Sequence, residues 1–192
     1  MGVREDKKRH THARLERAAL DLFARRGYER TTVGDIAARA GVSARTAFRY
    51  FPAKADLVFG DADADLSALR ARLAAQDGSL PAIQAVRAAL TEFSEHIDTP
   101  INAERSRVVA SNPTLTARSL ELRELWAEAV AAEVAARRGA SAVDERDRLA
   151  GLLVVAILVS AVRQWSLGNG DRRRLRGTVE RAASWAVEIL RP

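Results

Sequence analysis

The stretch TTVGDIAARAGVSARTAFRYF, Thr31–Phe51, predicts two short helices joined by a tight turn. Apolar residues recur at helical spacing up to Ala40. Gly41 follows at the place where a helix C-terminus favours a residue that tolerates positive φ. Ser43 can then begin a second helix by accepting a hydrogen bond from a backbone N–H two or three residues further on. This arrangement is typical of a helix-turn-helix that places its second helix in the major groove of DNA.

The second of these helices is expected to end near Phe51, because Pro52 disfavours the helical conformation of the residue before it. We expect Ala47, Phe48 and Phe51 on its inward side, with core packing as the favoured role of Phe48, and Val42 buried in the turn. The outward and marginal positions are mostly basic or hydroxyl-bearing, as suits contact with DNA. They are Ala44, Arg45, Thr46, Arg49 and Tyr50.

The net charge of the chain is concentrated around this motif. Residues 1–60 hold 13 Lys+Arg and 7 Asp+Glu, which is the whole formal excess of +6, and the remaining residues hold 18 of each. A basic region attracts the phosphate backbone through counterion release, which is independent of base sequence. A solvated basic face is the plainer alternative, but it does not explain why the excess coincides with the turn signature.

Length and composition exclude several classes of protein. A chain of 192 residues without cysteine forms no disulfide and no thiolate metal site, and it fits a reducing cytosol. Its polar N-terminus lacks the apolar segment of a signal peptide. The longest nearly uncharged apolar run, Leu149–Val162, is too short to cross a bilayer comfortably. We therefore predict a cytoplasmic protein with no membrane segment.

Helical periodicity extends over most of the chain, and alternating strand patterns are absent, so an all-α fold of about nine helices is expected. Residues 1–10 lack an apolar period and are predicted to form a mobile basic arm. Helices are expected over residues 11–26, 54–75, 80–97, 102–110, a stretch ending before Gly139, 144–167 and 171–190. The first helix and the two of the turn motif should share one core, made of Leu15, Leu22, Phe23, Val33, Ile36, Ala37, Val42, Phe48 and Phe51.

The helix expected over residues 144–167 is apolar around almost its full circumference, so it must be covered on both sides. Pairing this helix and the last one with their copies in a second subunit would bury the surface in a four-helix bundle. The alternative is burial within one chain. The residues predicted to form this homodimer contact are Leu152, Val155, Val159, Val162, Val179, Ala183 and Ala186.

The run TTVGDIAARAGVSARTAFRYFPAKADL, residues 31–57, resembles the DNA-binding domain of TetR-family transcriptional regulators. The preceding LDLFARRGYERTT, residues 20–32, resembles the segment that usually precedes the helix-turn-helix in that family. The resemblance implies an all-helical homodimer that represses from a pseudo-palindromic double-stranded operator and is released by a small-molecule effector. It divides the chain into a helix-turn-helix DNA-binding domain, residues 1–60, and a C-terminal ligand-binding and dimerisation domain, residues 61–192.

The resemblance also implies roles for individual residues of the DNA-binding domain. Ala44, Arg45 and Arg49 become candidates for contact with base edges. The other DNA-binding candidates are Thr32, Ser43, Thr46, Tyr50 and Lys54, all but the helix-capping Ser43 as phosphate contacts. The family often has glycine where this chain has Arg45, and tyrosine where it has Phe48. Arg45 could read guanine through two hydrogen bonds, or it could contact phosphate without base preference.

The C-terminal half is similar to a subgroup of actinobacterial regulators that includes the mycofactocin-system regulator, whose effectors are acyl-coenzyme A thioesters. The similarity lies in Asn112-Pro113-Thr-Leu115 and in residues spaced from Arg118 to Gly139. It implies an acyl-thioester or another apolar anion as effector. Candidate effector-binding residues are Phe93, Arg105, Arg107, Arg118 and Trp126. For the three arginines the favoured interpretation is a solvated charge on a helix face, because glutamates accompany them in the same stretch.

Signs of catalysis are lacking in the sequence. His10, His12 and His96 have no carboxylate cluster at metal-ligand spacing near them, and glycine-rich phosphate loops and nucleophile-elbow patterns are missing. We expect no enzyme, no metal and no cofactor. The remaining rival is a helical interaction protein that uses its basic domain on any nucleic acid or on an anionic surface.

Overall fold

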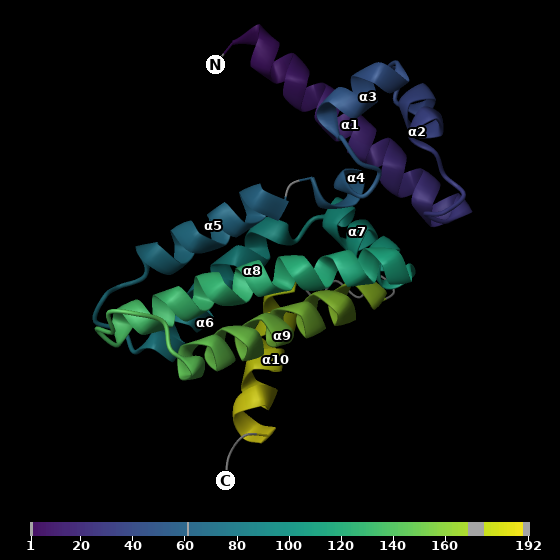
Figure 1. Cartoon of the computed structure of the whole chain (residues 1–192). Coiled ribbons are helices and arrows are strands. Elements are labelled where there is room, and N and C mark those ends of the chain that lie inside the picture. The colour runs from purple at the N-terminus through teal and green to yellow at the C-terminus, as the bar shows by residue number, and fades with distance from the viewer. Residues whose placement is uncertain (1, 61, 169–174, 190–192) are drawn as a thin grey trace.

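The computed structural model describes residues 2–60, 62–168 and 175–189, and in these ranges the regular elements are ten helices (Figure 1). The all-α fold is therefore confirmed, and one of the ten, α4, is a single turn. The helices are α1 (Val3–Arg26), α2 (Val33–Arg39), α3 (Ala44–Tyr50), α4 (Asp56–Phe59), α5 (Ala62–Ala75), α6 (Ala82–Ile97), α7 (Pro100–Ala110), α8 (Pro113–Arg137), α9 (Glu145–Leu167) and α10 (Leu175–Ile189).

Helix α1 begins earlier than the sequence predicted. Residues 3–10, expected to be a mobile arm, continue the helix toward the N-terminus, and those whose side chains are described are exposed there. Charged residues with good helix propensity need no apolar face to extend a helix that is already packed further along. An ion pair between Arg9 and Asp6, one turn apart, adds to this extension.

The helix expected over residues 54–75 is divided at Gly60 into α4 and α5. The chain passes close to Phe51 at this point, because a Cβ atom added to Gly60 would lie 2.7 Å from Cε1 of the Phe51 ring. The missing side chain lets the backbone make this approach, and the helix is interrupted where the approach occurs.

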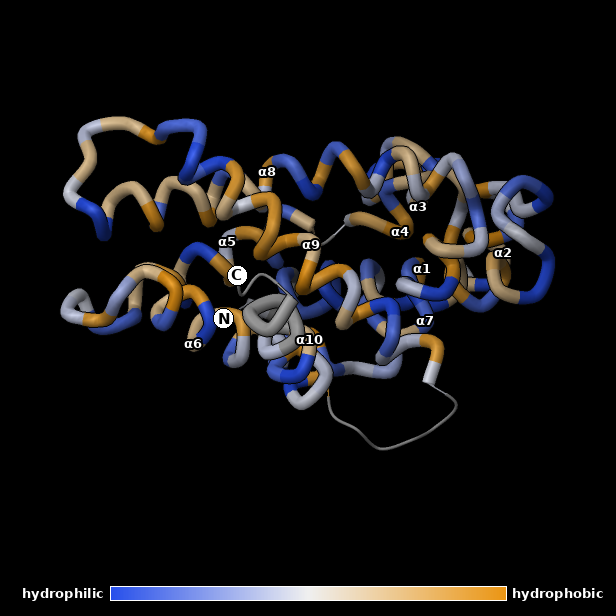
Figure 2. Tube along the Cα trace, turned by 90° about the horizontal axis from the view of Figure 1, so that it is seen from below, coloured by the Kyte–Doolittle hydropathy of each residue, from blue (hydrophilic) through white to orange (hydrophobic). Residues whose placement is uncertain are grey.

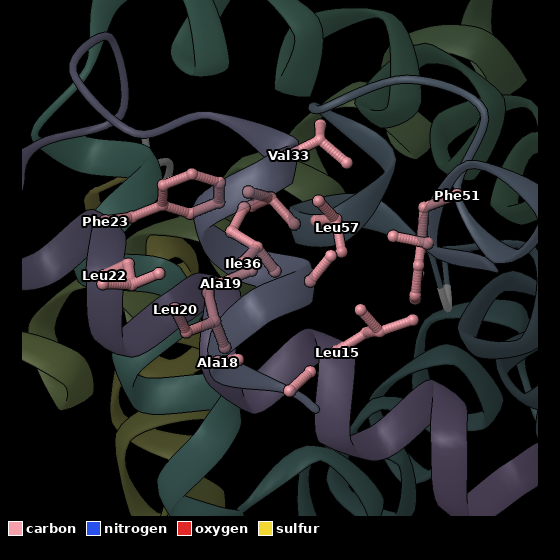
Figure 3. Close-up of a cluster of buried hydrophobic side chains, with 14 of the residues drawn as sticks. Leu15, Ala18, Ala19, Leu20, Leu22, Phe23, Val33, Ile36, Phe51 and Leu57 are labelled. Carbon is pink, nitrogen blue, oxygen red and sulfur yellow. The ribbon is translucent and has the colours of Figure 1, made fainter. Parts of the chain in front are cut away.

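A first core joins α1, α2, α3 and α4 (Figure 3). The predicted members are buried there, except Val42, which is half-buried, and Phe48, whose side chain is 50% exposed. The prediction for Phe48 was therefore wrong. Ala47 and Phe51 lie one turn apart on the inward stripe of the short helix α3, and Phe48 lies about 100° around the axis from Ala47.

The first core also takes in side chains from the C-terminal half. Val108 of α7 and Leu115 of α8 are buried in the same cluster as Leu15 and Phe23 of α1. The DNA-binding helices thus rest on the corner between α7 and α8 (Figure 1).

A second core holds the C-terminal helices together, with α8 and α9 running side by side and α6, α5 and α10 packed around them (Figure 1). A Cβ atom at Gly151 of α9 would lie 2.2 Å from the carbonyl oxygen of Ala127 in α8, so the two backbones touch at this glycine. Much of α9 is hydrophobic (Figure 2). Its neighbours decide which part of that surface is covered.

Candidate nucleic-acid interface and ligand cavity

The turn between α2 and α3 has the geometry that the sequence indicated. Gly41 adopts a φ of 64°, and the N–H of Val42 donates to the carbonyl of Ala37 at 2.9 Å. The Ser43 hydroxyl caps α3 by accepting from the N–H of Thr46 at 3.1 Å. A hydrogen bond from Arg14 of α1 to the carbonyl of Ala40 fixes the turn against the first helix. Helix α3 is therefore held in one orientation.

The outward face of α3 carries cationic side chains. Ala44, Arg45 and Arg49 are exposed, whereas Thr46 and Tyr50 are half-buried. The guanidinium carbon of Arg49 lies 5.6 Å from the centroid of the Tyr50 ring. Two guanidinium groups on a two-turn helix with a small first residue match the shape and acceptor pattern of a major groove.

Thr32 lies at the N-terminus of α2, where its hydroxyl accepts from the N–H of Asp35 at 3.1 Å and donates to Oδ2 of Asp35 at 2.6 Å. The Asp35 carboxylate also accepts from the N–H of Thr32 at 3.0 Å. Hydrogen bonds from the Thr32 side chain and backbone lower the pKa of Asp35, which favours the carboxylate form. Thr32 therefore fixes where α2 begins.

Lys54 has an internal role that the sequence did not indicate. Its ammonium donates to the carbonyls of Tyr28 at 3.0 Å and Thr31 at 3.3 Å, and it lies 4.1 Å from the centroid of the Tyr28 ring. Burial of the ring, followed by the nearby charges of Glu29 and Asp56, raises the pKa of the Tyr28 hydroxyl. These contacts tie the segment after α3 to the loop between α1 and α2.

A cavity of about 490 Å³ lies between α4, α5, α7, α8 and α9. Its volume is within the range of roughly 300–1,000 Å³ that small-molecule sites occupy. The apolar part of its wall comes from Val58, Phe59, Leu122, Trp126, Val155, Leu158, Val159, Val162 and Trp165. The polar part comes from Asp65, Asn102, Arg105, Ser106, Thr116, Ser119, Arg123 and Arg163.

Two of the predicted effector residues, Arg105 and Trp126, line this cavity. Phe93 is fully buried behind it, with its ring centroid 5.3 Å from that of Trp126 in an edge-to-face contact. Arg107 points elsewhere and donates to the carbonyl of Ser166 at 2.9 Å. Arg118 forms an exposed ion pair with Glu121. Phe93, Arg107 and Arg118 thus lie outside the cavity lining.

Sequence reasoning missed Arg123 and Arg163, which also line the cavity. Arg123 lies one turn before Trp126 on α8, and partial burial lowers the pKa of its guanidinium. Arg163 follows Val162 on α9. In the sequence, the two arginines stand out only by their spacing from apolar residues on the same helix. That spacing does not show that α8 and α9 line the same cavity.

Arg105 links the cavity to the DNA-binding helices. From α7 it forms an ion pair with Glu16 of α1, 89 residues away in sequence, and it donates a second hydrogen bond to Asn102. The side chains of Arg105 and Glu16 are only 16% and 9% exposed. Burial lowers the pKa of Arg105, but a guanidinium keeps its proton in proteins.

The residues predicted to form the dimer contact lie in different environments. Val155 and Val179 are buried within the chain itself, and Val159 and Val162 are half-buried and line the cavity. Packing within one chain therefore already covers much of these four side chains, and their part in a dimer contact stays a prediction. Leu152 is 53% exposed, and Leu149 and Leu153 are exposed beside it on α9. The side chains of Ala183 and Ala186 lie outside the described residues. One part of the apolar surface of α9 thus lies in the core, a second part lines the cavity, and a third part, the exposed strip of Leu149, Leu152 and Leu153, is in contact with solvent.

Helix α9 is also long and apolar enough to cross a membrane, by length and composition alone. Core helices of soluble proteins can have the same length and composition, and 33% of the most apolar 18-residue stretch of α9 is buried inside the chain. The four-residue start of α9, Glu145–Arg148, carries only charged side chains.

Comparison with known proteins gives a consistent picture. The family model "Bacterial regulatory proteins, tetR family" matches residues 16–59, and the model "MftR C-terminal domain" matches residues 80–188. The mycofactocin biosynthesis transcriptional regulator MftR of Mycobacterium tuberculosis is 32% identical over 149 residues, which cover 77% of this chain and 75% of that protein. The HTH-type transcriptional regulator TcmR of Streptomyces glaucescens is 33% identical, over all of this chain and 87% of its own length.

Solved structures share the fold. The repressor FadR of Thermus thermophilus, crystallised with lauroyl-CoA, superposes with a TM-score of 0.58 at 22% identity, and the match covers 94% of this chain and 95% of FadR. At this level of identity the similarity concerns the fold.

Proposed function

This chain belongs to the TetR family and is a DNA-binding transcriptional regulator, and we propose that it is a repressor released from its operator when an amphipathic anion enters the cavity. The observation that carries the proposal is the chemistry of that cavity. Aliphatic and tryptophan side chains form one part of its wall, and the arginines Arg105, Arg123 and Arg163 lie in the other part. Such a lining suits a ligand with an apolar chain and an anionic group.

On the DNA side, residues 1–60 form the proposed reader and α3 is its recognition helix. Arg45, Arg49 and Ala44 lie on the face that would meet base edges. Thr32, Thr46, Tyr50 and Lys54 are the proposed contacts to the phosphate backbone of the DNA. Ser43 belongs to the same surface as the residue that caps α3. Residues 61–192 form the proposed ligand-binding and dimerisation domain. Two copies would set their recognition helices about 34–36 Å apart, as a pseudo-palindromic operator requires.

The proposed effector class is an acyl-thioester or another apolar anion. An acyl chain would lie against Leu158 and Trp126, and each buried methylene would contribute about 0.8 kcal/mol to binding. The anionic group would pair with the guanidinium groups of the wall. The cavity volume of about 490 Å³ favours burial of the acyl chain, and because a thioester is uncharged, the phosphates of a coenzyme A ester would have to lie at the end of the cavity that the arginines line.

Selection of bound sites from random duplex DNA, followed by titration with lauroyl-CoA, tests the proposal. We expect a pseudo-palindromic preference that survives competitor DNA and moderate salt, and a fall in operator affinity of roughly 5- to 150-fold with saturating ligand. Coenzyme A without an acyl chain is the matched control and should leave operator affinity unchanged. Equal affinity for every duplex would favour the rival, a basic protein that binds polyanions without sequence preference. Unchanged operator affinity with lauroyl-CoA and with free dodecanoate would reject this effector class.

A further inference from the structure

We propose that the ion pair between Arg105 and Glu16 carries the signal from the cavity to the DNA-binding domain, because a bound anion competes with Glu16 for Arg105. This inference rests on the proposed function, since it requires an anionic effector in the cavity. It assigns Glu16 the role of a positioning residue that touches neither ligand nor DNA.

The ion pair between Arg105 and Glu16 is largely buried. Glu16 is on α1 beside Leu15 and Ala19 of the first core, and only 7% of the whole residue is exposed. A carboxylate in such surroundings requires a partner, because burial of an uncompensated charge is strongly unfavourable. Arg105 supplies that partner from the other domain.

Helix α7 contributes residues both to the cavity and to the first core. Asn102, Arg105, Ser106 and Val109 follow one another at helical spacing and line the cavity. Val108, by contrast, is buried in the first core together with α1. Arg105 therefore belongs to the cavity lining, and its guanidinium also makes the contact with α1.

An anion bound in the cavity would compete with Glu16 for Arg105. An anion in the cavity would accept charge-assisted hydrogen bonds from the Arg105 guanidinium, which in the absence of ligand donates to Glu16. The Glu16 carboxylate would lose stabilisation in a buried position, so the docking of α1 on α7 would weaken. Arg123 and Arg163 line the same cavity, but the described residues give them no ion pair with α1. By thermodynamic reciprocity, DNA binding to the docked state weakens ligand binding by the same factor.

The variant Glu16→Gln tests this mechanism because it keeps the shape of the side chain and removes its charge. Arg105 would then lose its ion pair with Glu16, so the ligand would no longer compete with that carboxylate. We expect lauroyl-CoA to bind Glu16→Gln more tightly than the wild type in the absence of DNA, by roughly 3- to 10-fold. We expect the ratio of operator affinities without and with ligand to fall to within about threefold of unity, against a typical coupling of roughly 5- to 150-fold. Calorimetry would give the ligand affinity and fluorescence anisotropy the operator affinity.

Two further variants separate a relay from a purely structural contact. Arg105→Gln also breaks the pair, but it removes the ligand's cation, so ligand binding should weaken while coupling is lost as well. A contact that only stabilised the fold would move ligand affinity in the same direction in both variants. Glu121→Gln is the matched control, because it removes one carboxylate from an exposed arginine pair on α8 and should change neither quantity.

The outcomes distinguish this inference from the proposed function. If the wild type releases its operator with lauroyl-CoA and Glu16→Gln does so to the same extent, the relay is wrong and the effector class stands. If Glu16→Gln binds ligand more weakly, competition is wrong. If the wild type itself fails to respond, the proposed effector class is wrong, and the relay with it. Should Glu16→Gln not fold, Glu16→Asp keeps the charge on a shorter side chain and should show reduced coupling with tighter ligand binding.

Discussion

Arg45 is the residue at which this protein's own DNA preference should be found. It is exposed on α3, on the face opposite Ala47 and Phe51. If it binds guanine, Arg45→Ala should relax discrimination at one or two base pairs in each half-site by ~1–3 kcal/mol. Anisotropy titrations against single-base operator variants would measure this loss.

The control for Arg45 is Arg87→Ala, which removes an exposed arginine from α6, in the other domain. It should leave both affinity and base discrimination unchanged. A uniform loss of affinity across all operator variants after Arg45→Ala would show that the side chain contacts phosphate instead.

Asp147 makes the stability of the fold depend on pH. Its carboxylate is fully buried at the start of α9, with Oδ1 3.0 Å from Nε of Arg138 and Oδ2 2.7 Å from Nη2. The side-chain hydrogen bonds from Arg138, followed by the backbone N–H of Asp144, lower the pKa of Asp147. A carboxyl group whose pKa is lowered by folding stabilises the protein above its unfolded pKa of about 3.9, and this stabilisation is lost as pH falls through the folded pKa.

We therefore expect Asp147→Asn to be less stable than the wild type at pH 7, and the difference to shrink as pH falls below about 4. Urea unfolding at a series of pH values would measure the two free energies. Glu128→Gln, which alters an exposed pair with Arg148, should show little difference at any pH. A difference for Asp147→Asn that stayed constant down to pH 3 would mean that the hydrogen-bonded shape, not the charge, matters.

At the scale of elements, the contact between α8 and α9 depends on one missing side chain. Gly151→Ala would place a Cβ atom 2.2 Å from the Ala127 carbonyl oxygen and 3.0 Å from its carbon. Backbone atoms cannot rotate away, so the helices must separate. We expect a loss of about 1–3 kcal/mol in the free energy of unfolding, as for other overpacked cores.

Gly177→Ala in α10 is the control for this substitution, because the nearest atom to its new Cβ would be the end of the Arg181 side chain at 3.6 Å. It should be neutral or stabilise the protein by roughly 0.5–1 kcal/mol, as alanine does in a helix interior. Urea denaturation would compare the two. Similar effects of both variants would contradict the close approach of α8 and α9.

The elements were largely predictable because their ends carry local signals. Ser43 and Asp144 cap α3 and α9 where the sequence placed those helices, and Asn112 and Pro113 begin α8. The errors have local or tertiary causes. Residues 3–10 extend α1 through local propensity and the ion pair between Arg9 and Asp6, and the helix predicted over residues 54–75 is interrupted at Gly60, where the backbone comes close to the Phe51 ring.

At the scale of the whole molecule, the exposed strip of α9 predicts the dimer contact. Leu149, Leu152 and Leu153 are 44–57% exposed. Because adjacent exposed leucines on one helix are unfavourable in water, we expect a second copy of the chain to cover them. Leu152→Glu should shift the protein toward a monomer in sedimentation velocity experiments. Operator affinity should fall as well, because linked half-sites gain from their effective concentration.

Ile83→Glu is the matched control for the dimer, since Ile83 is 65% exposed but lies on α6, away from this strip. It should remain dimeric and bind the operator normally. A Leu152→Glu protein that sediments like the wild type would place the dimer contact on another surface.

The sequence by itself determined most of the helices, the capping of α3 by Ser43, the turn geometry around Gly41 and the placement of positive charge on the DNA-binding domain. These features follow from interactions between residues that are close in the chain. Resemblance to a family then supplied the regulator function.

Only the tertiary structure decided how those helices use their faces. Periodicity shows that α9 is apolar on all sides, but not that Val155 is covered by the chain, that Val159 lines a cavity and that Leu152 is exposed. Likewise, the cavity arginines and the pairing of Arg105 with Glu16 depend on packing between helices that are far apart in sequence. A local pattern fixes the polarity of a face, whereas the neighbour that covers it is chosen by the packing of the whole molecule.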